Sequence, residues 1–419
     1  MNFQESYDWL ISLSNFPRKE YMSDPRHCSW YLKRLQFFLD ILGNPEKKIP
    51  HYIHVTGTSG KGSVTTMMHS ILHESGKSVG STYSPHPTTI LERWKVGNKH
   101  MTKKEFVELI EYIKPKLDKY IKTTPYDMLS FFELTEAIGF VYFAKKKVNW
   151  VVLEVACGGR YDSSNIIPKK DVAIITNIDL DHVGIIGNNK EEIAYEKSGI
   201  IKPGCAVFTQ ERNKKILEVI NKECRKNKTS LNQVNNKINY ELNVLGEHQQ
   251  KNAALCSAVA KHLDIPENKI KAGLLKIRLP IRMEIVSKKP LIILDGAHNP
   301  DKIKSTVNTI NELANLQTFK PVNLIIGFSE NKDTTSMIRQ LSKLEPKSIA
   351  CTRYTNNPFR KVTDPADTAK KFKKILPNSK IAIFLDPSDA LNWSKKQKGL
   401  ILATGSIFLS GELREKLTN

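Results

Sequence analysis

The sequence lacks the features that mark secreted, membrane and metal-cluster proteins. Its 419 residues include six cysteines, scattered without a close pair, so we expect neither a disulfide framework nor a zinc cluster. No apolar run approaches the ~20 residues that a helix needs to cross a bilayer. The first residues lack the basic and apolar segments of a signal peptide. We therefore expect a cytoplasmic protein with no membrane partner.

Acidic residues are also few relative to basic ones. The chain has 64 Lys and Arg against 43 Asp and Glu, a formal net charge of +21. Such an excess is typical of nucleic-acid-binding proteins, and a basic P-loop NTPase acting on nucleic acid is one alternative. The lysines, however, are spread along the whole chain without interleaved aromatic residues. Solvated helix surfaces explain most of this charge and a polyanionic substrate part of the rest, so we expect no nucleic-acid partner.

The pattern of apolar residues predicts two α/β domains. Short apolar runs, typical of buried parallel strands, alternate with segments of helical periodicity. In the first series we expect strands at 78–82, 151–155, 172–176 and 206–208, and helices at 31–42, 104–121, 131–147 and 190–198. After a break, a second series has strands at 291–294, 322–326, 348–352, 381–384 and 400–403. We predict a P-loop-type, mostly parallel sheet flanked by helices in an ATP-binding domain (1–285), and a smaller Rossmann-like α/β domain (286–419).

The segment Ile53–Val64 gives the strongest functional signal. An apolar strand leads into a glycine-rich turn, and a helix then begins. Glycines let backbone N–H groups converge on a phosphate, and the helix N-terminus adds its positive dipole end. Lys61 would reach the β- and γ-phosphates, and the Ser63 hydroxyl would ligate Mg²⁺. The usual G-x-x-x-x-G-K-[ST] pattern is altered by Val55 and by the inserted Gly62, so a purely structural turn is the alternative; the flanking strand and helix favour ATP binding.

Polar residues follow the expected strands at their carboxyl ends, where ligands bind in such sheets. Glu154 ends an apolar strand, where a carboxylate is costly unless it is paired or binds a metal. His182 follows the 172–176 strand and is a candidate Mg²⁺ ligand, although imidazole is unusual for this cation. Ser84 could add a hydroxyl ligand. For each, hydrogen bonding within the protein is the structural alternative.

Three further positions are ambiguous from the residues alone. Lys197 lies at a helix end, where the helix dipole favours any lysine. Asn252 lies at a helix start and could cap the helix or contact a base. Asp295 follows the 291–294 strand, which suggests a ribose contact in a nucleotide-binding protein.

Taken together, these motifs resemble the folylpolyglutamate synthase/dihydrofolate synthase family, a branch of the Mur-ligase superfamily. The matching segments run in order through nearly the whole chain, at 42–45, 57–63, 84–86, 153–165, 180–182, 196–202, 248–253, 295–300 and 405–406. The resemblance implies an ATP-dependent carboxylate–amine ligase that adds L-glutamate to dihydropteroate, to reduced folates or to both through an acyl phosphate. The alternative within the superfamily is an amide ligase that joins an amino acid to a non-folate acid.

The resemblance also implies roles for individual residues. The ATP phosphates would be held by Gly57, Thr58, Gly60, Lys61, Gly62 and Ser63. The rest of the nucleotide would contact Asn252, Arg282 and Asp295. Mg²⁺ would be ligated by Ser63, Ser84, Glu154 and His182. Lys197 would be carboxylated and its carbamate would serve a second Mg²⁺, and His298 would lie near the incoming glutamate as a third catalytic residue beside Lys61 and Lys197.

The chain departs from the family pattern at a few positions. Ser59 replaces an Asn in the phosphate loop, Ala156-Cys157 replaces Gly-Leu or Gly-Ile near the expected pterin, and Ile281 replaces Gly before Arg282. None of these changes removes a catalytic group. Because one chain would contain the whole ATP site, we expect a monomer.

Overall fold

The chain divides into two units in a computed structural model that describes residues 1–13, 28–235, 239–316, 320–330, 332–356 and 361–418. The first unit consists of Met1–His86, Ile90–Leu242 and Gln250–Ile277. The second consists of Pro87–Thr89, Asn243–Gln249 and Arg278–Asn419. No helix in the described ranges is long and apolar enough to cross a membrane. The domain boundary after residue 285 stays a prediction.

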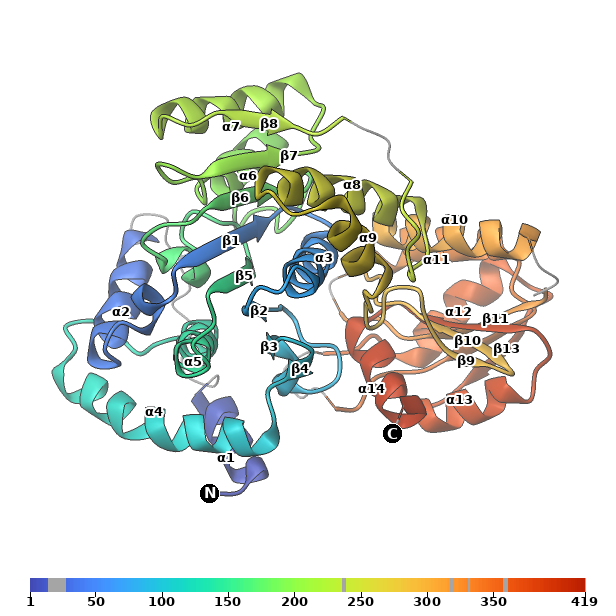
Figure 1. Ribbon diagram of the computed structural model, residues 1–419. Helices are drawn as coiled ribbons and strands as arrows, with labels where there is room; N and C mark the ends of the chain where they lie inside the picture. Colours follow the sequence, from blue (N-terminus) through green and yellow to red (C-terminus); the bar gives the residue numbers. More distant parts are fainter. Residues whose placement is uncertain (14–27, 236–238, 317–319, 331, 357–360, 419) are drawn as a thin grey trace. The chain divides into compact units, whose positions relative to one another are not determined.

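An eight-stranded sheet forms the first unit, with β1 (His51–Thr56) between β5 and β6 (Figure 1). The strand order is β4-β3-β2-β5-β1-β6-β7-β8; β3 is antiparallel to both of its neighbours and the other pairs are parallel. The other strands are β2 (Val79–Thr82), β3 (Trp94–Val96), β4 (Lys99–His100), β5 (Trp150–Glu154), β6 (Val172–Ile175), β7 (Ala206–Thr209) and β8 (Leu231–Gln233). The parallel strands β1, β2, β5 and β6 therefore end at one edge.

The helices of this unit begin at clear sequence signals. Capping boxes start α4 at Thr102 and α5 at Ser130, in each case with a Glu three residues later, which satisfies backbone donors of the first turn. Gly273 lets α9 pack closely on α3, since a Cβ there would lie 2.6 Å from Ile71 Cα. The helices are α1 (Phe3–Ser12), α2 (Cys28–Ile41), α3 (Lys61–Glu74), α4 (Lys103–Thr123), α5 (Phe131–Lys145), α6 (Lys190–Ser198), α7 (Lys214–Lys226), α8 (Glu247–His262) and α9 (Glu267–Leu275), with 3₁₀ turns η4 (Pro45–Lys48), η5 (Ile90–Arg93) and η6 (Ser163–Ile166).

The second unit contains a six-stranded sheet in the order β13-β12-β11-β14-β10-β9. Its strands are β9 (Glu284–Lys288), β10 (Leu291–Leu294), β11 (Val322–Ile326), β12 (Ser348–Cys351), β13 (Lys380–Ile383) and β14 (Leu400–Thr404). Its helices are α10 (Pro300–Leu316), α11 (Thr334–Leu341), α12 (Pro365–Ile375), α13 (Pro387–Lys395) and α14 (Ile407–Thr418), with η7 (Ser342–Leu344). All pairs are parallel except β9 with β10, so most of the strands end at a common edge.

The predicted fold class is confirmed, and the expected strands and helices are found close to their predicted positions. Four strands, β3, β4, β8 and β9, were not predicted from the sequence. Each of them is short, or half-exposed, or both, so none has the continuous apolar run that reveals a buried parallel strand.

Candidate active site

The phosphate loop fits closely between the end of β6 and helix α8. Gly57 has φ 146° and Gly60 has φ 84°, in the region that side chains disfavour. A Cβ on Gly57 would lie 1.9 Å from Thr176 Oγ1, and one on Gly60 would lie 2.9 Å from Asn252 Oδ1. Both glycines are therefore required by backbone conformation and by space. The predicted residue Asn252 does lie against the loop.

Hydrogen bonds to the segment after β6 hold the loop in place. Thr58 N donates to Asn177 O (2.9 Å), and Thr58 Oγ1 donates to Asp179 O (3.0 Å). Ser59 N donates to Asn177 Oδ1 (2.9 Å), while Thr176 Oγ1 donates to Ser59 O (2.6 Å). The serine at position 59 thus keeps the loop anchored through its backbone. A loop fixed in this way loses little freedom when a nucleotide binds.

Glu154 lies beside the start of α3, and its role as a magnesium ligand stays a prediction. Its residue is 5% exposed, and a Cβ on Gly62 would lie 3.4 Å from its Oε2. Ser84 N donates to the same oxygen at 3.2 Å, and the neighbouring Ser63 is buried. Carboxylate and hydroxyl oxygens suit Mg²⁺. In the described ranges no three His, Cys, Asp or Glu residues are grouped to hold a metal, so hydroxyl and phosphate oxygens would have to complete the coordination.

Lys197 is buried at the same loop. Its side chain is 1% exposed, and its Nζ donates to Gly57 O (3.1 Å) and lies 3.3 Å from Asp181 Oδ2. Lys61 Nζ donates to the same carbonyl of Gly57 at 2.8 Å. Burial, reinforced by the charge of Lys61, lowers the pKa of Lys197 to about 8. An appreciable fraction of Lys197 is therefore a neutral amine near neutral pH.

Asp181 lies beside Lys197 but is not among the site residues predicted from the sequence. Burial alone would raise the pKa of its carboxyl, but the charges of Lys197, Lys61 and His182 outweigh burial and lower it. Its position next to His182, after a buried strand, was the available signal. His182 itself has a half-exposed side chain whose Nε2 lies 3.7 Å from Asp181 Oδ1. Its role as a metal ligand stays a prediction.

In the second unit, Asp295 makes hydrogen bonds within the protein with both carboxylate oxygens. Oδ1 accepts from Ala297 N (3.1 Å) and Thr306 Oγ1 (2.7 Å), and Oδ2 accepts from Met283 N (3.1 Å). The side chain is nearly buried. These bonds fix the turn after β10 and the segment that carries Arg282. The predicted nucleotide contact of Asp295 stays a prediction.

His298 is held as a neutral imidazole. Its Nδ1 donates to Gly296 O (2.8 Å), and its Nε2 accepts from Lys302 Nζ (3.2 Å). Burial, followed by the charges of Lys302, Arg282 and Lys332, lowers its pKa to about 3. With this pKa His298 is a weak base at neutral pH.

Arg282 lies between two residues with left-handed backbone conformations, Ile281 (φ 50°) and Met283 (φ 50°). Gly296 N donates to Ile281 O at 2.7 Å, and a Cβ on Gly296 would lie 2.8 Å from Arg282 Nη1. A β-branched residue is strained in this conformation. The Ile281 side chain, however, is 2% exposed and belongs to an apolar core with Ile292.

We expect Ile281→Gly to destabilise the protein although it relieves the strain. Relief of the left-handed conformation is worth about 1–2 kcal/mol, whereas loss of a buried isoleucine side chain costs about 2–5 kcal/mol. The thermal unfolding midpoint should therefore fall, and by more than in Ile281→Val, which keeps the β-branch. A midpoint equal to or above that of the wild type would show that strain dominates.

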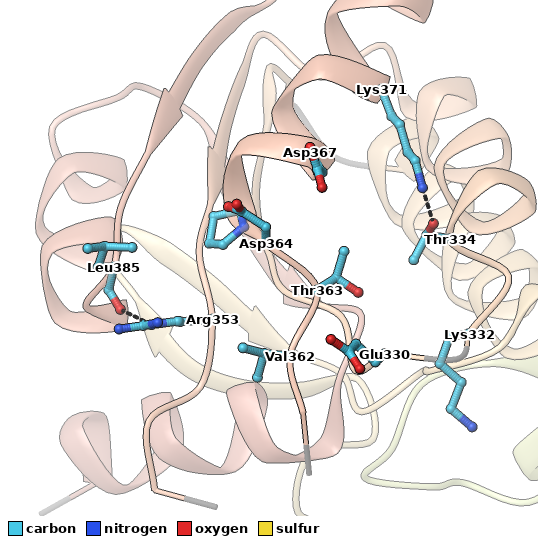
Figure 2. Close-up of a pocket in the computed structure, with 11 residues that line it drawn as sticks. Glu330, Lys332, Thr334, Arg353, Val362, Thr363, Asp364, Asp367, Lys371 and Leu385 are labelled. Carbon is cyan, nitrogen blue, oxygen red and sulfur yellow. Dashed lines mark hydrogen bonds between the residues drawn. The ribbon is translucent and has the colours of Figure 1, made fainter. Parts of the chain in front are cut away.

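A polar pocket of about 620 Å³ lies at the carboxyl edge of the second sheet (Figure 2). Its lining residues follow β11, β12 and β13, namely Glu330, Lys332, Thr334, Arg353, Val362, Thr363, Asp364, Pro365, Asp367, Lys371 and Leu385. Hydrogen bonds hold two of the basic side chains that line the pocket: Lys371 Nζ donates to Thr334 Oγ1 (2.7 Å), and Arg353 Nε donates to Leu385 O (3.3 Å). None of the predicted site residues lines it.

Comparison with known proteins gives consistent matches over both units. The description "Mur ligase middle domain" matches residues 55–260, and "Mur ligase, glutamate ligase domain" matches 281–407. The dihydrofolate synthase/folylpolyglutamate synthase of Bacillus subtilis (strain 168) is 30% identical over 92% of this chain and 94% of the relative. The folylpolyglutamate synthase of Lacticaseibacillus casei is 29% identical over 82% and 83%. The solved folylpolyglutamate synthase of Thermotoga maritima has a TM-score of 0.83 at 28% identity, covering 99% of this chain and 97% of that chain.

Proposed function

The chain belongs to the folylpolyglutamate synthase/dihydrofolate synthase family of ATP-dependent ligases, and we propose that it joins the amine of L-glutamate to the carboxylate of dihydropteroate, of a reduced folate, or of both. The observation that supports this most directly is the convergence of Lys61, Lys197 and Glu154 on one phosphate loop. A nucleotide site with two lysines and a carboxylate is equipped to transfer a phosphoryl group to an acid.

In the first step the acceptor's carboxylate attacks the γ-phosphate of ATP, which gives an acyl phosphate and ADP. Lys61 neutralises charge that develops on the transferred phosphoryl group, and the amides at the start of α3 bind phosphate oxygens. Asn252, which lies against Gly60, contacts the nucleotide. Holding carboxylate and phosphate in line contributes up to about 7–11 kcal/mol to lowering the barrier.

Ser63, Ser84, Glu154 and His182 would hold Mg²⁺, which, when bound, neutralises the phosphates of ATP. The buried Glu154 carboxylate beside Gly62 and the Ser84 amide fits that role. Lys197 is suited to carboxylation by CO₂, because that reaction needs a neutral amine and the pKa of Lys197 is lowered to about 8. The resulting carbamate would present oxygen ligands to a second ion.

In the second step the amine of glutamate attacks the acyl carbon and phosphate leaves. His298 is expected near this amino acid, and its neutral state suits hydrogen bonding to the substrate better than removal of a proton. Arg282 is expected to contact the nucleotide. Exclusion of water protects the acyl phosphate from hydrolysis.

The test is ADP release by the purified protein with Mg-ATP and L-glutamate, comparing dihydropteroate with tetrahydrofolate as the acceptor. Stimulation by dihydropteroate assigns dihydrofolate synthase activity, stimulation by tetrahydrofolate assigns folylpolyglutamate synthase activity, and stimulation by both makes the enzyme bifunctional. Lys61→Ala protein, prepared identically, controls for a contaminating ATPase. If neither acceptor raises ADP release, the superfamily alternative with a non-folate acid replaces this proposal.

A monomeric state and a cytoplasmic location also stay predictions. The first is supported by the fact that the phosphate loop, Asn252, Glu154 and Lys197 all belong to one unit of one chain. Gel filtration with light scattering would test it.

A further inference from the structure

Lys170 is a buried lysine that the proposed chemistry does not use. It lies in the loop before β6, is 4% exposed, and pairs with no carboxylate among the residues that the structure describes. Burial of an unpaired ammonium group is costly, and burial together with the charge of Lys202 lowers the pKa of Lys170 well below its ordinary value. Such a residue needs a structural or functional compensation, and its hydrogen bonds indicate which one.

One set of hydrogen bonds runs from Lys170 to the loop after β5. Lys170 Nζ lies 2.7 Å from His54 Nδ1, and His54 Nε2 lies 2.8 Å from Ser164 Oγ. Ser164 Oγ in turn donates to Asp162 Oδ1, and Asp162 Oδ2 accepts from Cys157 N at 3.0 Å. All the side chains from Lys170 to Asp162 are buried. The chain of bonds therefore ends on the backbone of the Ala156-Cys157 loop.

The direction of these bonds is fixed by the donors. Ser164 Oγ donates its one proton to Asp162 Oδ1 and so must accept from His54; the neutral ring therefore accepts from the Lys170 amine at Nδ1 and carries its own proton on Nε2. That proton goes to Ser164 Oγ, whose own proton goes to Asp162. Burial and the charges of Lys170 and Lys202 keep the pKa of His54 well below its ordinary value, which agrees with a neutral ring.

A second set of hydrogen bonds runs from Lys170 to the end of α6. Lys170 Nζ donates to Asn165 Oδ1 (3.0 Å). The amide group of Asn165 then donates through Nδ2 to Arg160 O (3.0 Å) and Gly199 O (3.1 Å). Gly199 is the C-cap of α6, two residues after Lys197. One lysine thus holds both the loop after β5 and the helix that carries Lys197.

The two held segments touch each other beside Lys197. Arg160 N donates to Glu196 O at 2.9 Å, and a Cβ on Gly159 would lie 2.8 Å from Lys197 O. We infer that Lys170 is a positioning residue for Lys197: through His54 and Asn165 it fixes the backbone on both sides of Lys197, so that the Lys197 amine lies at Gly57 and Asp181. What the positioned amine does rests on the proposed function.

The test compares Lys170→Met, which keeps the length of the side chain but removes its donors, with Leu109→Ala. Leu109 is buried on α4 in the apolar core with Phe106, so its truncation destabilises the same unit without touching the hydrogen bonds of Lys170. Both proteins are compared with the wild type at a temperature where all are folded. Hydrogen exchange of peptides covering 156–160 and 196–201 should be faster in Lys170→Met than in Leu109→Ala. Equal protection in these peptides would overturn the inference, whatever reaction the protein catalyses.

The consequence for activity is measured with the acceptor that the enzyme uses. We expect kcat of Lys170→Met to fall by about 10- to 100-fold, the size of effect that a small misplacement produces, with the KM for ATP nearly unchanged. Leu109→Ala should keep its kcat within about threefold. In protein equilibrated with ¹³C-bicarbonate, a carbamate resonance lost in Lys197→Ala should also be weaker in Lys170→Met. If Lys170→Met has the kcat of the wild type, Lys170 has only a structural role and does not position Lys197 for the reaction. If the wild type is inactive with every acceptor, the proposed function fails, and the hydrogen-exchange comparison alone decides whether Lys170 positions Lys197.

Discussion

Lys61→Ala is expected to lower kcat by about 10³-fold, the upper end of the range for loss of one charged or oriented group that stabilises a transition state. Lys61 is the first residue of α3, and its Nζ donates to the Gly57 carbonyl within the phosphate loop. The substitution replaces the long cationic side chain by a methyl group, so the charge that would neutralise the phosphoryl group is lost. No other residue of the loop carries a positive charge. The measurement is steady-state ADP release with the preferred acceptor.

Lys104→Ala is the matched control, because Lys104 is an exposed lysine on α4 in the same unit. It should retain the kcat of the wild type. Binding of ADP to Lys61→Ala, measured by calorimetry, shows whether the loop still folds. If the Lys61→Ala protein is folded and turns over almost as fast as the wild type, the prediction that this loop binds the phosphates of ATP is wrong.

Much of the site could be predicted because its signals are local. A glycine-rich turn between a strand and a helix is visible in the residues around Lys61. Glu154 stands out as a charge at the end of an apolar strand. Parallel strands bring such strand ends to one edge, which is why the structure places Glu154, Ser84 and Gly62 together.

The features of the candidate site that could not be predicted depend on contacts between residues far apart in the chain. The strand-end pattern predicts a nucleotide contact for Asp295, but it cannot reveal the hydrogen bonds of this carboxylate to Met283 and Thr306. The lysine at position 197 looks like an ordinary helix-end residue until burial and Asp181 are known. Lys170 looks like a solvated lysine in a basic chain. Only tertiary packing distinguishes a buried ammonium group from an exposed one.

Lys197→Ala is expected to lower kcat by about 10²- to 10³-fold, and added acetate should restore part of the activity. The physical reason is the proposed carbamate: alanine removes both the amine that reacts with CO₂ and the oxygen ligands that the product offers to Mg²⁺, while a small carboxylate can occupy the space with similar oxygens. Lys190→Ala is the control, because Lys190 begins the same helix with a side chain that is 43% exposed. It should keep its activity and gain nothing from acetate.

The pH dependence of carboxylation separates a reactive Lys197 from an ordinary lysine. CO₂ reacts with the neutral amine, and the pKa of Lys197 is lowered to about 8, so below pH 8 the reactive fraction should rise about tenfold per pH unit. Above pH 8 the rate should level off, whereas a lysine with an ordinary pKa would continue to accelerate past pH 10. The measurement is the rate at which CO₂-depleted enzyme regains activity at constant dissolved CO₂ between pH 6.5 and 9.5. A rate that still rises steeply at pH 9.5 would mean that the pKa of Lys197 is not lowered. The lowered pKa could then not be the reason why Lys197 reacts with CO₂.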